Sequence, residues 1–165
     1  FNCSLDNCFI PEIDFYDFYL ISAGTLGDEK LARKDVAEAL KINYVNYLGI
    51  LPWLTQITKN NRMDYEGSLW VFTSVASERG RPSNYHYGAA KAGIINLTSA
   101  LSTQWAKNRV RVNAVAPGWT DTPLLRPKER NSHRDLTPIL NAVPQKRLME
   151  ASEIADVIFR LLQSV

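Results

Sequence analysis

Three short apolar runs alternate with three longer helical patterns, and this alternation constrains the fold more than any other feature of the chain. The apolar runs cover residues 17–21, 69–73 and 110–115, which suits strands buried on both faces. The helical patterns cover residues 35–54, 87–108 and 152–162. Because parallel strands require long crossover connections, usually helical, this order predicts an α/β fold with a parallel sheet.

Composition and charge exclude several classes of protein. Among 165 residues, 45% are hydrophobic and 22% are charged, which is ordinary for one soluble domain. The net charge of +2 is scattered and gives no basic patch for nucleic acid. No apolar run is long enough to span a membrane, and no signal peptide opens the chain. We therefore expect a cytoplasmic protein with neither a nucleic-acid nor a membrane partner.

The cysteines and histidines do not predict a metal site. Cys3 and Cys8 lie five residues apart without a second pair, which favours free thiols. His86 and His133 are too few and too far apart for a histidine-based site. We expect no metal.

A tyrosine and a lysine four residues apart are the best candidates for chemistry. Tyr87 and Lys91 would share one face of the second predicted helix, and Ser74 lies 13 residues before the tyrosine, at the end of a strand. Such a trio can move a proton to and from a carbonyl or hydroxyl oxygen. The ammonium of Lys91 is expected to lower the pKa of Tyr87, and a shift of roughly 3 units needs about 4 kcal/mol.

Other interpretations of these residues remain open. Tyr87 is preferred to Tyr85 because only Tyr87 has a lysine four residues later, and Ser74 competes with Thr73 and Ser77. A half-exposed tyrosine packed on a surface lysine is the bland alternative, because a short motif alone is weak evidence.

Six segments, beginning at Asp17, resemble the short-chain dehydrogenase/reductase family in sequence, order and spacing. They are DFYLISAG (17–24), INYVNYLG (42–49), WVFTSVAS (70–77), YGAAKAGIINLTSAL (87–101), VNAVAPGWTDTPL (112–124) and PQKRLMEASEIADVIFRLL (144–162). The resemblance implies a doubly wound, Rossmann-like parallel sheet in three α/β/α layers. It also implies hydride transfer between NAD or NADP and a small carbonyl or alcohol substrate.

The resemblance assigns roles to individual residues. Tyr87 would be the acid–base group, Ser74 would hold the substrate oxygen, and Lys91 would lower the tyrosine pKa and bind the nicotinamide ribose. Asn46, in competition with Asn43, would anchor a relay water. The remaining cofactor-binding residues would be Ala23, Gly24, Pro117, Gly118 and Thr122, although a loop threonine is often only a turn residue.

The sequence also departs from the family pattern. Ile21 and Ser22 stand where the family has two asparagines, and no glycine-rich phosphate-binding turn or final strand is present. We expect one partial domain over residues 1–165, truncated at both ends. Its parts would be the central strands and helices (17–118), a lobe over the substrate (119–143) and a C-terminal helix (150–163).

The resemblance predicts self-association and leaves two other functions open. A homodimer or homotetramer would form through the two long helices, whose second apolar faces would be Tyr44/Leu48/Leu51 and Ile94/Leu97/Leu101. A non-catalytic relative that binds or scaffolds is one alternative function. The other is a doubly wound ligand-binding domain of another family.

Overall fold

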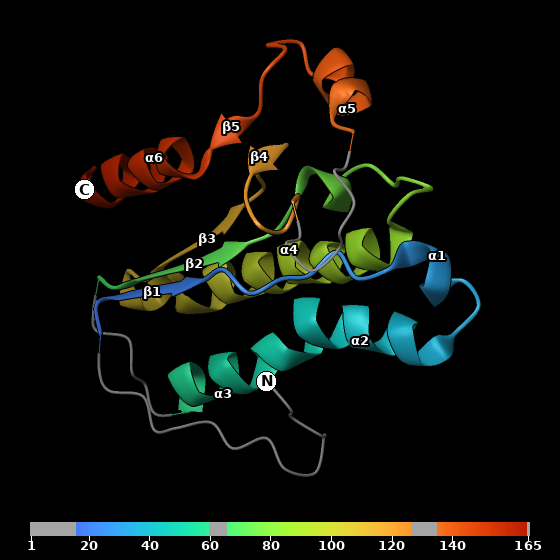
Figure 1. The fold of residues 1–165 in the computed structure, drawn as a ribbon. Coiled ribbons are helices and arrows are strands. Elements are labelled where there is room, and N and C mark those ends of the chain that lie inside the picture. The colour runs from blue at the N-terminus through green and yellow to red at the C-terminus, as the bar shows by residue number, and fades with distance from the viewer. Residues whose placement is uncertain (1–15, 60–65, 127–134, 165) are drawn as a thin grey trace. The chain divides into compact units, whose positions relative to one another are not determined.

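A computed structural model describes residues 16–59, 66–126 and 135–164 (Figure 1). The chain divides after Ala116 into two compact units, which are described separately. The predicted single domain over residues 1–165 stays a prediction.

The first unit contains a parallel sheet of three strands, as the sequence predicted. These are β1 (Phe18–Ile21), β2 (Ser68–Phe72) and β3 (Arg111–Val115), in the order β1-β2-β3. Both pairings are parallel, with Leu20 opposite Trp70 and Trp70 opposite Asn113. The predicted strand limits differ from the observed ones by one residue.

Helices connect the strands. The α-helices are α1 (Glu29–Ala32), α2 (Val36–Asn46), α3 (Leu51–Lys59) and α4 (Tyr85–Trp105). Short 3-10 helices are η1 (Leu48–Ile50), η2 (Val75–Ser77) and η3 (Ala106–Asn108). The predicted helix over residues 87–108 is therefore confirmed as α4 continued by η3.

The prediction of one uninterrupted helix over residues 35–54 is wrong. The helix breaks at Tyr47, whose backbone has φ −137° and ψ −66°, and η1 separates α2 from α3. Pro52 lies in the first turn of α3, where backbone N–H groups have no acceptor within the helix, so the N–H that proline lacks is not needed there. Inside a continuous helix the same proline would remove one such bond.

Residues 25–34 contain α1, a helix that the sequence pattern did not predict. Asp28 is the N-cap of this helix, and its carboxylate accepts hydrogen bonds from the backbone of Lys30 and Leu31 at 3.0 and 3.1 Å. Asp35 caps α2 in the same way. Two capping aspartates seven residues apart are the sequence signal for a short helix between them.

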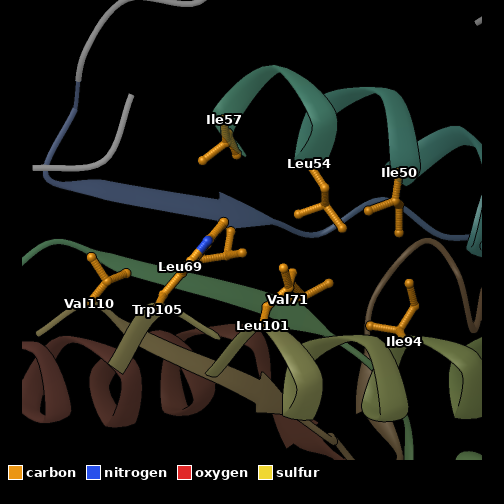
Figure 2. Packing of buried hydrophobic residues seen from close by; sticks show 9 residues of the cluster. All are labelled: Ile50, Leu54, Ile57, Leu69, Val71, Ile94, Leu101, Trp105 and Val110. Atoms are coloured by element: carbon orange, nitrogen blue, oxygen red, sulfur yellow. The ribbon is translucent and has the colours of Figure 1, made fainter. Parts of the chain in front are cut away.

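The main hydrophobic core lies between one face of this sheet and two helices (Figure 2). Leu69 and Val71 are both fully buried and, being two residues apart, point to the same face of β2. The other buried members are Ile50, Leu54, Ile57, Ile94, Leu101, Trp105 and Val110. Since they come mainly from α3 and α4, both helices cover that face.

This core overturns one of the surfaces expected for self-association. Ile94 and Leu101 are buried in the cluster, and Leu97 packs against it. These side chains therefore cannot form an outward-facing apolar stripe on α4. The residues of the other expected stripe, Tyr44, Leu48 and Leu51, are half-buried.

The second unit contains a small parallel sheet and two helices. Its elements are β4 (Thr120–Asp121), α5 (Thr137–Ala142), β5 (Met149–Glu150) and α6 (Ala151–Gln163). The predicted C-terminal helix is confirmed, and Glu150 and Glu153 form a capping box at its start. Hydrogen bonds from Arg147 and from the Glu150 backbone lower the pKa of Glu153 to about 2. Residues 119–143, expected as a lobe over the substrate, include β4 and α5.

Within the described residues, no helix is both long and apolar enough to cross a membrane.

We predict that Gly88→Ala destabilises the first unit by about 1–3 kcal/mol, because a Cβ at this position would lie 2.8 Å from the Ala76 carbonyl oxygen. That atom belongs to the backbone and cannot rotate away. Urea unfolding measures the effect. Gly80→Ala is the matched control, since nothing lies within 4 Å of its Cβ position. Equal stability of the two variants would contradict the prediction.

Candidate active site

Ser74 and Tyr87 meet where η2 packs on the first turn of α4. Ser74 has an extended backbone and caps η2, with its Oγ accepting from the Ala76 N–H at 3.2 Å. Gly88 lets the Ala76 carbonyl approach α4 closely. In this arrangement the Ser74 side chain is close enough to Tyr87 to lower the pKa of the tyrosine.

The two competitors of Ser74 use their hydroxyls elsewhere. Thr73 Oγ1 donates to the Val115 carbonyl at 3.1 Å. Ser77 Oγ donates to the carbonyl of Ser74 itself. Of these three hydroxyl side chains, the one that acts on the pKa of Tyr87 is that of Ser74.

Tyr87 is almost completely buried, whereas Tyr85 is largely exposed. The Tyr87 side chain belongs to a second apolar cluster with Ala32, Ile42 and Ala76. Burial raises the pKa of Tyr87, and the hydrogen bond with Ser74 acts in the opposite direction. The sequence predicts that Lys91 lowers this pKa. The structure reverses the direction because burial disfavours the phenolate.

Lys91 is buried beneath the carboxyl ends of two strands, with only 2% of its surface exposed. Its Nζ donates to the carbonyls of Ala23 and Phe72, both at 3.0 Å. Phe72 ends β2, and Ala23 follows β1. Burial lowers the pKa of Lys91 to about 8, because the ammonium loses most of its hydration.

Gly24 and Asn46 lie next to this ammonium. A Cβ on Gly24 would be 3.2 Å from Asn46 Oδ1 and 3.4 Å from Lys91 Nζ. Asn46 is fully buried, and its Nδ2 donates to the carbonyls of Thr25 at 2.7 Å and Ile42 at 2.8 Å. Its Oδ1 accepts from the Thr25 N–H at 3.1 Å. The Asn46 side chain thus ties the segment after β1 to α2.

The competing asparagine makes only a local contact. Asn43 Nδ2 donates to the Ala39 carbonyl, one turn earlier in α2, at 2.9 Å. The structure therefore brings Ala23, Gly24, Asn46 and Lys91 together, while Asn43 lies outside this group.

Pro117, Gly118 and Thr122 belong to the second unit. Gly118 is exposed, with open space where a side chain would begin. The Thr122 hydroxyl donates to the Thr120 carbonyl at 3.5 Å, and its own carbonyl accepts from Leu125 and Arg126. Their contribution to cofactor binding stays a prediction.

Sequence reasoning missed Glu29 and His86. Glu29 is buried, and its Oε1 lies 2.8 Å from His86 Nδ1. His86 directly precedes Tyr87 in the chain. Glu29 and His86 are 57 positions apart, so no local spacing links them. The only sequence signal is the position of His86 beside the candidate tyrosine.

In the described part of the chain, no group of histidine, cysteine and acidic residues could hold a metal ion. Cys3, Cys8 and His133 lie outside the described residues. The expectations about these residues remain untested.

Comparison with known proteins identifies the family. Residues 11–164 match a family model described as enoyl-(acyl carrier protein) reductase. A crystal structure of a short-chain dehydrogenase/reductase from Brucella melitensis superposes with a TM-score of 0.77 at 30% identity, covering 90% of this chain and 58% of that one. The chain belongs to the short-chain dehydrogenase/reductase family. The expected doubly wound, Rossmann-like α/β fold is thereby confirmed.

Other members of the short-chain dehydrogenase/reductase family show how much of a longer protein the chain matches. A 3-oxoacyl-[acyl-carrier-protein] reductase from Synechocystis is 30% identical over 142 residues, which are 86% of this chain and 55% of that protein. A 3-oxoacyl-[acyl-carrier protein] reductase from Brucella melitensis, solved in complex with NAD, shares the fold (TM-score 0.75, 23% identity), covering 90% of this chain and 60% of that one. Among the curated relatives compared, the chain spans between 22% and 60% of their length.

We predict that Asn46→Ala lowers the free energy of unfolding by about 1–3 kcal/mol, because it leaves the N–H and carbonyl of Thr25 without their partner. Urea unfolding tests this, with Asn43→Ala as the matched control. The prediction fails if Asn43→Ala costs as much as Asn46→Ala.

Lys91 should also give the stability a measurable pH dependence. Its pKa is about 8 in the folded chain and 10.5 for a lysine exposed to water, as in the unfolded chain, so between these pH values the unfolded chain binds more protons. The free energy of unfolding should therefore rise with pH, by about 2 kcal/mol between roughly pH 8 and pH 10. Lys91→Met removes this rise, whereas the exposed Lys107→Met keeps it. If the free energy of unfolding of Lys91→Met still rises with pH, another titrating group causes the rise.

Proposed function

We propose that this chain carries the catalytic core of an NAD(P)-dependent oxidoreductase acting on a carbonyl or alcohol substrate. The observation that carries the proposal is the packing of η2, which Ser74 caps, on α4, whose first turn carries Tyr87 and whose next turn carries Lys91. Membership of the short-chain dehydrogenase/reductase family supports it.

Tyr87 is proposed as the acid–base group. Burial raises its pKa, so at neutral pH the phenol is protonated and can donate its proton to a carbonyl oxygen. Ser74 is proposed to hold that oxygen by a hydrogen bond, because its side chain is close enough to Tyr87 to affect the pKa of the phenol. In the opposite reaction the same pair would remove the proton from an alcohol.

The residues around Lys91 fit a nicotinamide cofactor. Ala23 and Gly24 are exposed, and a Cβ on Gly24 would crowd both Asn46 and Lys91. Two N–H groups of Lys91 are bound to carbonyls, so the third is the one proposed for the cofactor ribose. Pro117, Gly118 and Thr122 are proposed to contact the nicotinamide, and Asn46 to anchor a relay water. The cofactor, NAD or NADP, would supply or accept the hydride.

The lobe of residues 119–143 is proposed to contact the substrate and select it. Two of the relatives are 3-oxoacyl-[acyl-carrier-protein] reductases, which makes 3-oxoacyl thioesters the first substrates to test.

A non-catalytic role is the second candidate. Lys91 already stabilises two strand ends, which is a structural role that needs no cofactor. Such a chain would keep the reductase core as a binding or scaffolding part.

We predict that Tyr87→Phe lowers carbonyl reduction by about 10²–10⁴-fold while NADH or NADPH binding is retained, because only the proton donor is lost. Calorimetric titration of the 165-residue chain measures binding, and nicotinamide absorbance measures turnover. Tyr85→Phe is the matched control and should retain activity.

Two results would refute the oxidoreductase proposal for this chain. One is the absence of saturable binding of either cofactor. The other is equal turnover by the Tyr87→Phe and Tyr85→Phe variants. Binding that Lys91→Ala weakens would support the role of that lysine in holding the cofactor.

A further inference from the structure

Helix α1 lies beside the first turn of α4 and contacts it (Figure 1). Both carboxylate oxygens of Glu29 face His86: Oε1 lies 2.8 Å from the ring nitrogen Nδ1, and Oε2 accepts from the backbone N–H at 3.4 Å. That N–H is one of the first four of α4, which have no acceptor within the helix. Glu29 therefore supplies an acceptor to the turn that carries Tyr87.

The Glu29 carboxylate is buried and hydrogen-bonded to His86. Glu29 is only 8% exposed, and a carboxylate removed from water is costly unless it is hydrogen-bonded or paired. The adjoining Asn84 is the N-cap of α4 but makes no side-chain capping bond, so its amide does not perform this task.

A second contact joins the same two segments. Arg33, at the end of α1, lies 5.5 Å from the centre of the Tyr85 ring and donates to the Pro82 carbonyl. Ala32 packs in the same apolar cluster as Tyr87. On the far side of Tyr87, Lys91 binds the Ala23 carbonyl. Residues 23–33 thus hold α4 both before and after the tyrosine.

We propose that Glu29 is a positioning residue for Tyr87, acting through His86 to hold the first turn of α4 so that the tyrosine hydroxyl meets Ser74. Glu29 does not touch the Tyr87 hydroxyl; it fixes the backbone next to it. This proposal rests on the function proposed above, but it can be tested without turnover.

The test measures how strongly Ser74 influences Tyr87. The chain is labelled with ¹³Cζ-tyrosine, and the Tyr87 resonance, assigned by its loss in Tyr87→Phe, is followed against pH. Because the hydrogen bond with Ser74 lowers the pKa of Tyr87, Ser74→Ala should move the titration to higher pH. The same comparison is then made in a Glu29→Ala background, where at least half of that displacement should disappear.

Glu38→Gln is the matched control. Glu38 Oε1 accepts from the Asp28 N–H at 2.9 Å, so it anchors the start of α1 to α2 and bonds nothing in α4. In this background the displacement caused by Ser74→Ala should be retained. Glu29→Gln, which keeps the side-chain shape and one acceptor, replaces Glu29→Ala if the smaller side chain prevents folding, and it too should reduce the displacement.

Each outcome decides the proposal. A full displacement in both Glu29 variants overturns it, as does a loss that Glu38→Gln reproduces, which would show general loosening of α1. The proposal is also overturned if Ser74→Ala does not displace the Tyr87 titration in the otherwise wild-type chain. If the displacement depends on Glu29 but no turnover is found with either cofactor, the positioning inference stands and the oxidoreductase proposal fails.

Discussion

In the first unit, the buried ammonium of Lys91 links α4 to the carboxyl ends of two strands. Lys91 donates to one carbonyl beyond β1 and one at the end of β2, so a single charge joins α4 to both strands. Parallel strands end at the same edge of their sheet, and that edge is therefore where one side chain can reach two of them. Replacing the ammonium by an apolar group would leave two carbonyls without a donor. The position of Tyr87, one turn earlier on the same helix, follows from this anchoring.

Small residues allow the elements around that edge to approach each other. Gly88 accommodates the Ala76 carbonyl, Gly93 accommodates the ring of Tyr47, and Gly24 lies against Asn46 and Lys91. The first two contacts bring η2 and the end of α2 close to α4, and the third brings the segment after β1 close to Asn46 and Lys91. The site is therefore determined by backbone proximity as much as by the side chains that would perform the chemistry.

The sequence predicted the strands and α4, because hydrophobic period and residue spacing are local properties. It did not predict α1, although Asp28 and Asp35 are capping residues, because six of the ten residues at 25–34 are charged or polar and resemble a loop. The break at Tyr47 was missed because the apolar spacing continues across it. Burial of Tyr87, and with it the direction of its pKa, depends on Ala32, Ile42 and Ala76, which are distant in sequence. The contact between Glu29 and His86 is equally non-local.

The parallel arrangement of the sheet also has a consequence for how the chain folds. Phe18 pairs with Ser68, and Ser68 pairs with Arg111, so each strand pair closes a loop of about forty to fifty residues. No hairpin can start such a sheet, and the intervening helices must be at least partly collapsed before their strands can meet. We therefore expect α4, whose contacts along the helix are local, to gain structure early and the β1–β2 pairing to complete late. The carbonyls that receive the Lys91 ammonium would then be assembled only in the last stage of folding.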